Sequence, residues 1–469
     1  MWKLLSIFPR SAMDLFRAPK NLVNLLRYGC PPTEPLLTNE VKQLMPQTVL
    51  PFKLEATDEQ LTAHGGLALF GEFLQAMTVP RQLDAALPAP GSRVGYHPSQ
   101  FVEPLLLMLH GGGRTLEDLR QLREDVGLRT VLRFAVLPSA DATGDWLRRM
   151  GEKAGLAGLA VVNQQQVRRA LKRESLTDYT LDLDATQIVA EKQAAQWTYK
   201  GERGYMPMLG HLADNGLVLG EEFREGNEAP ASRNLEFTQA CAAQMPKGKR
   251  IAHVRADSAA YQAELFNWCE DQKVTFAIGG VQDTAVQAAI AAIPATQWQP
   301  YSDGHLADTV HCMAKTTHAF RLIVLRRPVQ QDLFAAEALS LRYTLIATNR
   351  EGTPAEIVRW YNQRGETSEN RIKELKSGFG MERLPCGTFA ANAVFFRIGV
   401  LAYNLFVLFK LLALPQAWRR CQVRTVRWRL YQLAGKVVRH AGAVILKVQQ
   451  WRWGMCEEIR TRCAEAAQT

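Results

Sequence analysis

The sequence has no C-x-x-C pair, and its eight cysteines are scattered along the chain. This spacing excludes a cysteine-rich zinc module and argues against a disulfide-stapled secreted fold. The nine histidines are dispersed too, without an H-E-x-x-H motif, so a zinc-hydrolase site is not indicated. No internal repeat or low-complexity tract is present. We therefore expect a reduced, cytoplasmic protein.

Long apolar runs are also missing. In the most apolar part of the chain, the longest uncharged stretch, Ile398 to Phe409, has 12 residues. A membrane-spanning helix needs about 20, so we expect a buried core helix here. The N-terminus has only Leu4 to Phe8 as an apolar run, with charged residues close by, and no secretory signal is predicted.

Acidic residues are absent from Arg383 to Cys456, a stretch that contains twelve Lys or Arg. The whole chain has a net charge of +10, so the other 395 residues carry −2. Such asymmetry predicts a polyanionic partner, either nucleic acid or a membrane surface. Two other roles stay open for this basic region, which could hold a second protomer or cover the core with the aliphatic stems of its Arg side chains.

The composition of the 469 residues, 47% of them hydrophobic, is that of a globular protein. The length predicts roughly two to four domains. Residues 1–175 have apolar side chains at helical spacing and are predicted to be a helical DNA-binding or accessory region. Examples are Phe70, Phe73, Leu74, Met77, Leu116, Leu119 and Leu122.

Near Tyr179 the apolar period changes from helical to alternating, which is typical of a strand. Further strands are predicted along the chain, and Pro354 then opens a helix. The predicted strands cover residues 206–213, 217–223, 250–258, 274–280 and 342–349, with extra β-structure between 298 and 328. This α/β pattern predicts a catalytic domain at 176–292 and 340–382, a β-rich insertion at 293–339 and a basic helical region at 383–469.

Acidic residues stand at three places in this order of elements. Carboxylates suit Mg²⁺ or Mn²⁺, which bind phosphate oxygens as well. Two such ions about 4 Å apart can activate a nucleophile and stabilise the leaving oxygen in a phosphodiester displacement. A single Asp at a strand end is more often a cap or turn residue, but three acids in this order indicate nuclease or strand-transfer chemistry. They are Asp182 and Asp184, then Asp257, then Glu366, Glu369 and Glu374.

The motifs LDLDAT, VRADS and YNQRGETSENRIKELK resemble those of the DDE transposases of bacterial insertion sequences. The resemblance is to the IS-four-like superfamily and its thirteen-eighty branch, within the transposase DDE domain group 1. It extends over nearly the whole chain, through ERGYMPML, FREGN and PSADATGDWLRRMG. It implies a ribonuclease-H-like catalytic core with a β insertion before the last acid.

The resemblance implies that Asp184, Asp257 and Glu369 are the catalytic acids and the ligands of two Mg²⁺ ions, with Mn²⁺ as a possible substitute. Asp184 matches because the family's first acid stands two residues before a threonine. Glu369 is one residue further from Arg364 than in the parent superfamily. Because of this spacing, Glu366 and Glu374 remain alternatives for the third acid. Asp182 remains an alternative for the first, because it lies on the same strand face as Asp184.

The resemblance also implies DNA contacts. In the family, the tyrosine, arginine and lysine of the third motif contact phosphate, and a planar Arg fork or a Lys charge suits that role. Trp298, at the start of the insertion, is a candidate platform for an extruded base, or else a core tryptophan. The predicted DNA-binding residues are Tyr361, Arg364, Lys376, Arg224, Asn227 and Trp298.

These residues predict a transposase that binds the terminal inverted repeats of its element, cuts the ends and joins them to target DNA. Its partner would be double-stranded DNA, with a homodimer in the complex and a nucleoid-associated location. A catalytically inactive DNA-binding repressor and a nuclease without strand transfer are the alternatives.

Overall fold

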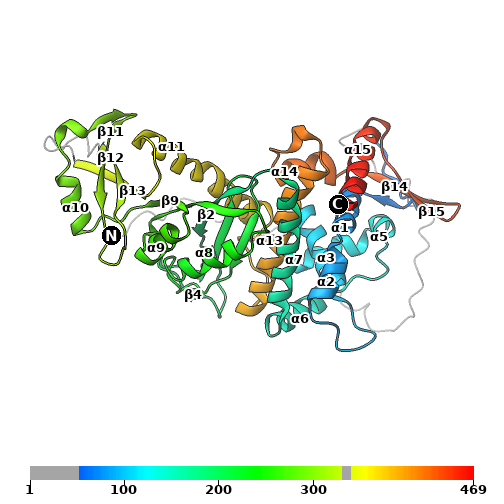
Figure 1. Ribbon diagram of the computed structural model, residues 1–469. Helices are drawn as coiled ribbons and strands as arrows, with labels where there is room; N and C mark the ends of the chain where they lie inside the picture. Colours follow the sequence, from blue (N-terminus) through cyan, green and yellow to red (C-terminus); the bar gives the residue numbers. More distant parts are fainter. Residues whose placement is uncertain (1–51, 330–339, 469) are drawn as a thin grey trace, which may run out of the picture. The chain divides into compact units, whose positions relative to one another are not determined.

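The computed structural model describes residues 52–329 and 340–468 (Figure 1). The chain divides into two compact units, residues 1–58 and 59–469, and everything below concerns the second. The N-terminal stretch for which we predict no secretory signal lies outside the described residues. Mixed α/β architecture, as the sequence predicts, is found in the second unit.

Helices fill residues 65–173, and residues 1–51 of the predicted helical region lie outside the described residues. The apolar residues predicted to line them are buried, among them Phe70, Phe73 and Leu122. Thr115 and Asp118 form a capping box at the start of the fourth segment. The elements are α1 (Gly65–Ala76), α2 (Val79–Ala86), α3 (Pro98–Gly111), η2 (Leu116–Asp118), α4 (Leu119–Glu124), α5 (Val126–Leu132), α6 (Ala140–Gly151) and α7 (Gly155–Arg173).

The main sheet has nine strands in the order β10-β11-β12-β13-β9-β8-β2-β6-β7. Strand β2 runs parallel to β8, and β8 runs parallel to β9, while every other pair in this sheet is antiparallel. The strands are β2 (Asp178–Ala185), β6 (Met208–Leu212), β7 (Val218–Glu222), β8 (Arg250–Ala256), β9 (Thr275–Gly279), β10 (Gln299–Tyr301), β11 (Gly304–His311), β12 (Phe320–Val329) and β13 (Ser340–Thr348).

Three helices follow or connect these strands, namely α8 (Asn234–Ala243), α9 (Ala263–Asp271) and α10 (Thr284–Ala291). The predicted extra β-structure is present, and β12 pairs directly with β13. The inserted strands β10, β11 and β12 therefore prolong the main sheet. Residues 330–339 of the predicted insertion lie outside the described residues.

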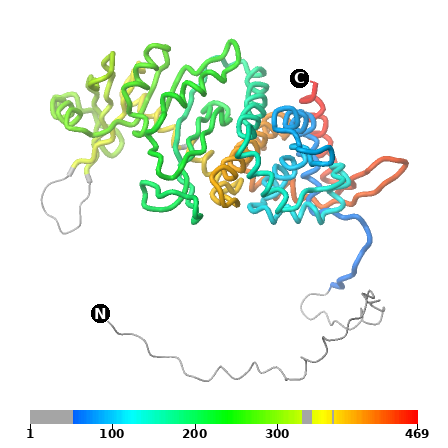
Figure 2. The backbone as a smooth tube through the Cα atoms, turned by 90° about the horizontal axis from the view of Figure 1, so that it is seen from below, coloured from blue at the N-terminus to red at the C-terminus, as the bar shows by residue number. Residues whose placement is uncertain are grey.

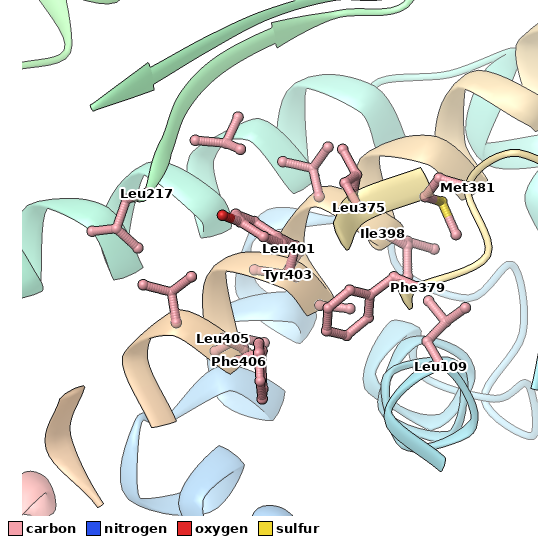
Figure 3. Packing of buried hydrophobic residues seen from close by; sticks show 14 of the residues in the cluster. Leu109, Leu217, Leu375, Phe379, Met381, Ile398, Leu401, Tyr403, Leu405 and Phe406 are labelled. Atoms are coloured by element: carbon pink, nitrogen blue, oxygen red, sulfur yellow. The ribbon is translucent and has the colours of Figure 1, made fainter. Parts of the chain in front are cut away.

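A long apolar helix, α13 (Phe389–Leu412), crosses the core beside α3, α6 and α7 (Figure 2). Figure 3 shows Ile398, Leu401 and Phe406 of this helix packed with Leu375 and Phe379. Among the described residues it is the one helix long and apolar enough to cross a membrane, yet 83% of its apolar window is buried inside the fold. That burial is the pattern of the core helix predicted from the sequence.

The C-terminal region differs from the all-helical prediction because it contains a β-hairpin. The turn, Ala441-Gly442, has positive φ angles of 49° and 80°, which suit a tight hairpin. The hairpin strand β14 also pairs with the short strand β1 (Leu61–Thr62). The other elements of this region are helical. The segments are α14 (Val423–Val426), η8 (Arg427–Tyr431), β14 (Gly435–His440), β15 (Ala443–Lys447) and α15 (Gln450–Ala467).

Candidate active site

Two of the predicted acids leave the sheet at the same edge. Asp184 is the penultimate residue of β2, and Asp257 directly follows β8. β2 and β8 are parallel neighbours, and Leu183 lies opposite Ala256. The residue that follows each of them is an acid, so Asp184 and Asp257 come at matching positions. The Asp257 side chain also accepts a hydrogen bond from the Ala259 amide, 3.0 Å away, so its local geometry is fixed.

The third acid lies on a helical segment with two wide turns. α11 (Pro354–Arg364) continues through a π-helical turn, η5 (Gly365–Glu369), into α12 (Asn370–Lys373) and a second π turn, η6 (Glu374–Gly378). A π turn accommodates one more residue than an α turn and is frequent at functional sites. Glu369 is the last residue of the first of these turns. The side chain of Glu366, an alternative acid, lies outside the described residues.

The pKa of Asp184 depends on the charges of both other acids. The pKa of Asp184 is raised to about 6, chiefly by burial and in smaller part by the charges of Asp257 and Glu369. Arg364 opposes them, with Nη2 lying 3.6 Å from Oδ1 of Asp184. The three acids thus share one electrostatic environment with an excess of negative charge.

Asp182, the competitor of Asp184, is engaged in a buried ion pair. Arg255 donates from Nε and Nη2 to the two carboxylate oxygens of Asp182, over 2.7 and 2.9 Å. The Arg255 Nη1 atom donates to the Trp360 carbonyl, 2.7 Å away. The side chains of Asp182 and Arg255 are 0% and 2% exposed. This pair joins β2, β8 and α11 in the interior.

Glu374, the other alternative for the third acid, belongs to a different contact. Its carboxylate accepts a hydrogen bond of 2.6 Å from the Val423 amide at the start of α14. Burial raises the pKa of Glu374, while Lys410 and Arg427 lower it. Glu374 therefore connects its helix to the C-terminal region.

The three third-motif residues lie around Asp184. Arg364 Nη2 donates to the Leu183 carbonyl over 3.3 Å. Burial raises the pKa of Tyr361, and the charges of Asp257 and Asp184 act in the same direction. Lys376 Nζ donates to the Gln187 carbonyl, 2.6 Å away, and lies 3.4 Å from Thr186 Oγ1. Its pKa is lowered chiefly by burial, although the charge of Asp184 raises it.

The remaining predicted DNA-binding residues lie in different settings. Arg224 is 1% exposed and forms ion pairs with Glu222 and Glu228, so its guanidinium is turned inward. Asn227 is exposed in the loop after β7. Trp298 is half-buried against the core below β11 and β12, with the Arg326 guanidinium 3.9 Å from its ring centre. Neither Arg224 nor the covered ring face of Trp298 is presented to a ligand.

Sequence reasoning missed two residues that shape the site. One is Arg255. Its signal in the sequence is a basic residue on a strand predicted to lie beside the strand that carries Asp182. Gly279, at the end of β9, is the other. A Cβ atom built there would lie 3.1 Å from the Tyr361 hydroxyl and 2.9 Å from the Ser258 amide nitrogen. The missing side chain of Gly279 leaves room for both groups.

The donor chemistry of this site fits a hard divalent cation. Asp184, Asp257 and Glu369 offer only carboxylate oxygens, which Mg²⁺ and Mn²⁺ prefer. A cation would also relieve the negative charge that raises the pKa of Asp184. Across residues 52–329 and 340–468, no three His, Cys, Asp or Glu side chains lie close enough to form a ready-made metal site. The charges of the three acids act on one another, but their side chains do not lie close enough together to form a complete set of metal ligands.

One comparison with known proteins identifies a family. A family model described as transposase DDE domain group 1 matches residues 47–454. Among solved structures, the piggyBac transposase in a synaptic complex with hairpin DNA is similar to this chain, with 10% sequence identity and a TM-score of 0.42. The alignment covers 88% of this chain and 84% of that one. The comparison with curated proteins gave no match.

Proposed function

The chain belongs to the transposase DDE domain group 1 family, and we propose that it is a DNA transposase of a bacterial insertion sequence. It binds the terminal inverted repeats of its element, cuts the DNA ends and joins them to target DNA. The single observation that carries this proposal is the electrostatic coupling of Asp184 to Asp257 and Glu369 beneath Arg364.

We propose that Asp184, Asp257 and Glu369 hold two Mg²⁺ ions, with Mn²⁺ as a substitute. Bound there, such ions supply Lewis acidity for an in-line displacement at a phosphodiester. Arg364 positions Asp184 and offers a planar fork to the terminal phosphate. Lys376 adds a point charge beside the end of β2, and Tyr361 places a hydroxyl next to Gly279.

We also propose that the catalytic domain is ribonuclease-H-like, in the IS-four-like superfamily and its thirteen-eighty branch. The strand order β7-β6-β2-β8-β9 supports this fold, because it places the third, second, first, fourth and fifth strands side by side. The direction of each strand is also in agreement, since only the first, fourth and fifth are mutually parallel. The protein would act in the cytoplasm on nucleoid DNA, as a homodimer in the complex.

Positive charge at the C-terminal end supports DNA as the partner. Seven of its twelve cations have exposed side chains: Arg383, Arg419, Arg420, Arg424, Arg429, Arg439 and Lys447. Others serve the fold, since Arg397 pairs with Glu221 and Arg427 donates to three backbone carbonyls. Exposed cations of this kind bind phosphates with a strong salt dependence.

A strand-transfer assay tests the proposal. The protein is incubated with Mg²⁺, labelled DNA carrying the flanks of its gene, and a circular target plasmid. Ends are supplied both uncut and pre-cut. A transposase cuts the uncut ends and joins the pre-cut ends to the plasmid. Cutting without joining would show a nuclease, binding alone a repressor, and no binding to either end would refute the proposal.

A further inference from the structure

Two aromatic side chains stand exposed on a small sheet that follows the first catalytic strand. This three-stranded sheet has the order β3-β5-β4 and consists of β3 (Ile188–Val189), β4 (Gln196–Trp197) and β5 (Arg203–Tyr205). Trp197 is 62% exposed and Tyr199 is 66% exposed. We call β4, β5 and the turn between them the aromatic hairpin. Its exposed rings are unusual because large aromatic side chains are mostly covered in folded proteins.

The backbone fixes the position of the aromatic hairpin. The Thr198 amide donates to the Glu202 carbonyl, and the Gly201 amide donates to the Thr198 carbonyl, over 2.8 and 3.0 Å. Gly201 has a φ of +77°, which favours glycine in a tight turn. At the other end, a Cβ atom on Gly204 would come within 2.1 Å of the Ile188 carbonyl oxygen. Strands β3 and β5 therefore pack closely. The two rings lie on β4 and on the ordered turn that follows it.

Gln187 connects this hairpin to the catalytic acids. Its Nε2 atom donates to Thr198 Oγ1 over 2.9 Å and to Glu202 Oε2 over 3.1 Å. Its carbonyl accepts the hydrogen bond from Lys376 Nζ. Gln187 itself follows Asp184 by three residues. The exposed rings are thus attached to the same segment that carries Asp184 and receives Lys376.

Positive charge accompanies the two rings. The Lys200 ammonium lies 5.6 Å from the ring centre of Tyr199, and the Arg203 guanidinium lies 5.9 Å from that of Trp197. The charge of Lys200 also contributes to lowering the pKa of Lys376, after burial as the main cause. Exposed rings beside cations are the combination that stacks nucleobases and holds the phosphates between them.

We propose that the aromatic hairpin stacks unpaired bases of the DNA strand next to the phosphate that is cut. This inference deepens the proposed function and depends on it. It assigns base stacking to Trp197 and Tyr199, in place of Trp298, whose ring packs on the core under Arg326. Such stacking is sequence-tolerant because every base has a π face.

A pair of DNA ends tests this assignment by fluorescence anisotropy. Both have the same duplex, and both carry a short single-stranded flank at the cut site. One flank has normal bases, and the other has abasic sites with an intact sugar-phosphate backbone. We expect the full-length protein to bind the normal flank about 5- to 100-fold more tightly. Trp197→Ala and Tyr199→Ala should each reduce that preference while keeping the affinity for the abasic DNA.

Two matched variants separate stacking from general effects. Trp197→Phe keeps an aromatic face and should retain most of the preference. Val189→Ala removes an exposed apolar side chain, 48% exposed, from the same small sheet and should leave the preference unchanged. Equal binding of both flanks by a protein that still cuts duplex ends would overturn the inference and spare the proposed function. Failure to bind any end DNA would overturn both.

Discussion

Arg255 binds both carboxylate oxygens of Asp182, with Nε 2.7 Å from Oδ1 and Nη2 2.9 Å from Oδ2. The pair is fully buried between β2 and β8. Asp184, two residues later, has instead a weaker neighbour in Arg364 and a raised pKa. Two aspartates on one strand therefore have different tasks, since the first stabilises the sheet and the second is the candidate ligand.

Stability measurements should distinguish these two aspartates. Asp182→Asn leaves Arg255 buried without its carboxylate and should lower the free energy of unfolding by about 3–5 kcal/mol. Asp184→Asn should leave it unchanged or raise it at pH 8, because the folded protein disfavours the charged form of Asp184. Urea denaturation without metal measures both. Equal losses for the two variants would contradict this division of roles.

Arg364 is expected to act through geometry. Arg364→Lys keeps the charge but loses the planar fork near Asp184 and Leu183. Loss of one charged hydrogen bond costs about 1.5–3 kcal/mol, so cleavage should slow by roughly one to two decades. Single-turnover cleavage of bound ends measures the rate. A wild-type rate in Arg364→Lys together with an inactive Arg364→Ala would show that charge alone is sufficient.

Glu103 should make stability depend on pH. Burial within α3 raises its pKa to about 7, with a smaller contribution from Asp84, while a hydrogen bond from Gln75 opposes the shift. Because the folded pKa lies above the unfolded value of 4.5, stability should fall between pH 4.5 and 7, by about 3 kcal/mol. Glu103→Gln should remove this fall in denaturation curves across pH. The exposed control Glu117→Gln should retain it.

The exposed C-terminal cations should determine part of the salt dependence of DNA binding. Changing Arg419, Arg420 and Arg424 to Gln should reduce the slope of log K against log[salt] by about 2.7 if each contacts a phosphate. Point changes are preferable to a truncation at residue 383, which would delete the buried helix α13. Lys315→Gln, at a residue 80% exposed elsewhere, is the control. An unchanged slope would assign the region to packing or dimerisation.

Several regular elements could be predicted from the sequence because their signals are local. The change to alternating apolar residues near Tyr179 predicted β2, and Pro354 predicted the start of α11. The apolar segment of α13 was recognised as core because Arg397 and Lys410 interrupt it. The C-terminal hairpin was missed, since abundant arginine and tryptophan near it suggested amphipathic helices.

The choice between neighbouring acids could not be predicted, because it depends on partners distant in sequence. Arg255 reaches Asp182 across 73 positions, and Val423 reaches Glu374 across 49. Spacing along one strand or helix contains no information about either contact. Arg224 is a different case, because its partners Glu222 and Glu228 are close in sequence. It was predicted to contact DNA, but its ion pairs with these acids hold it in the interior.

The central claim is that Asp184, Asp257 and Glu369 together cut DNA with a divalent metal ion. The most direct measurement is single-turnover cleavage of labelled ends in Mg²⁺ by the wild type and by Asp184→Asn, Asp257→Asn and Glu369→Gln, with end binding measured in parallel. The account predicts cleavage by the wild type that EDTA abolishes, and no cleavage by any variant despite near-normal binding. Cleavage at the wild-type rate by any one of the three variants would contradict it.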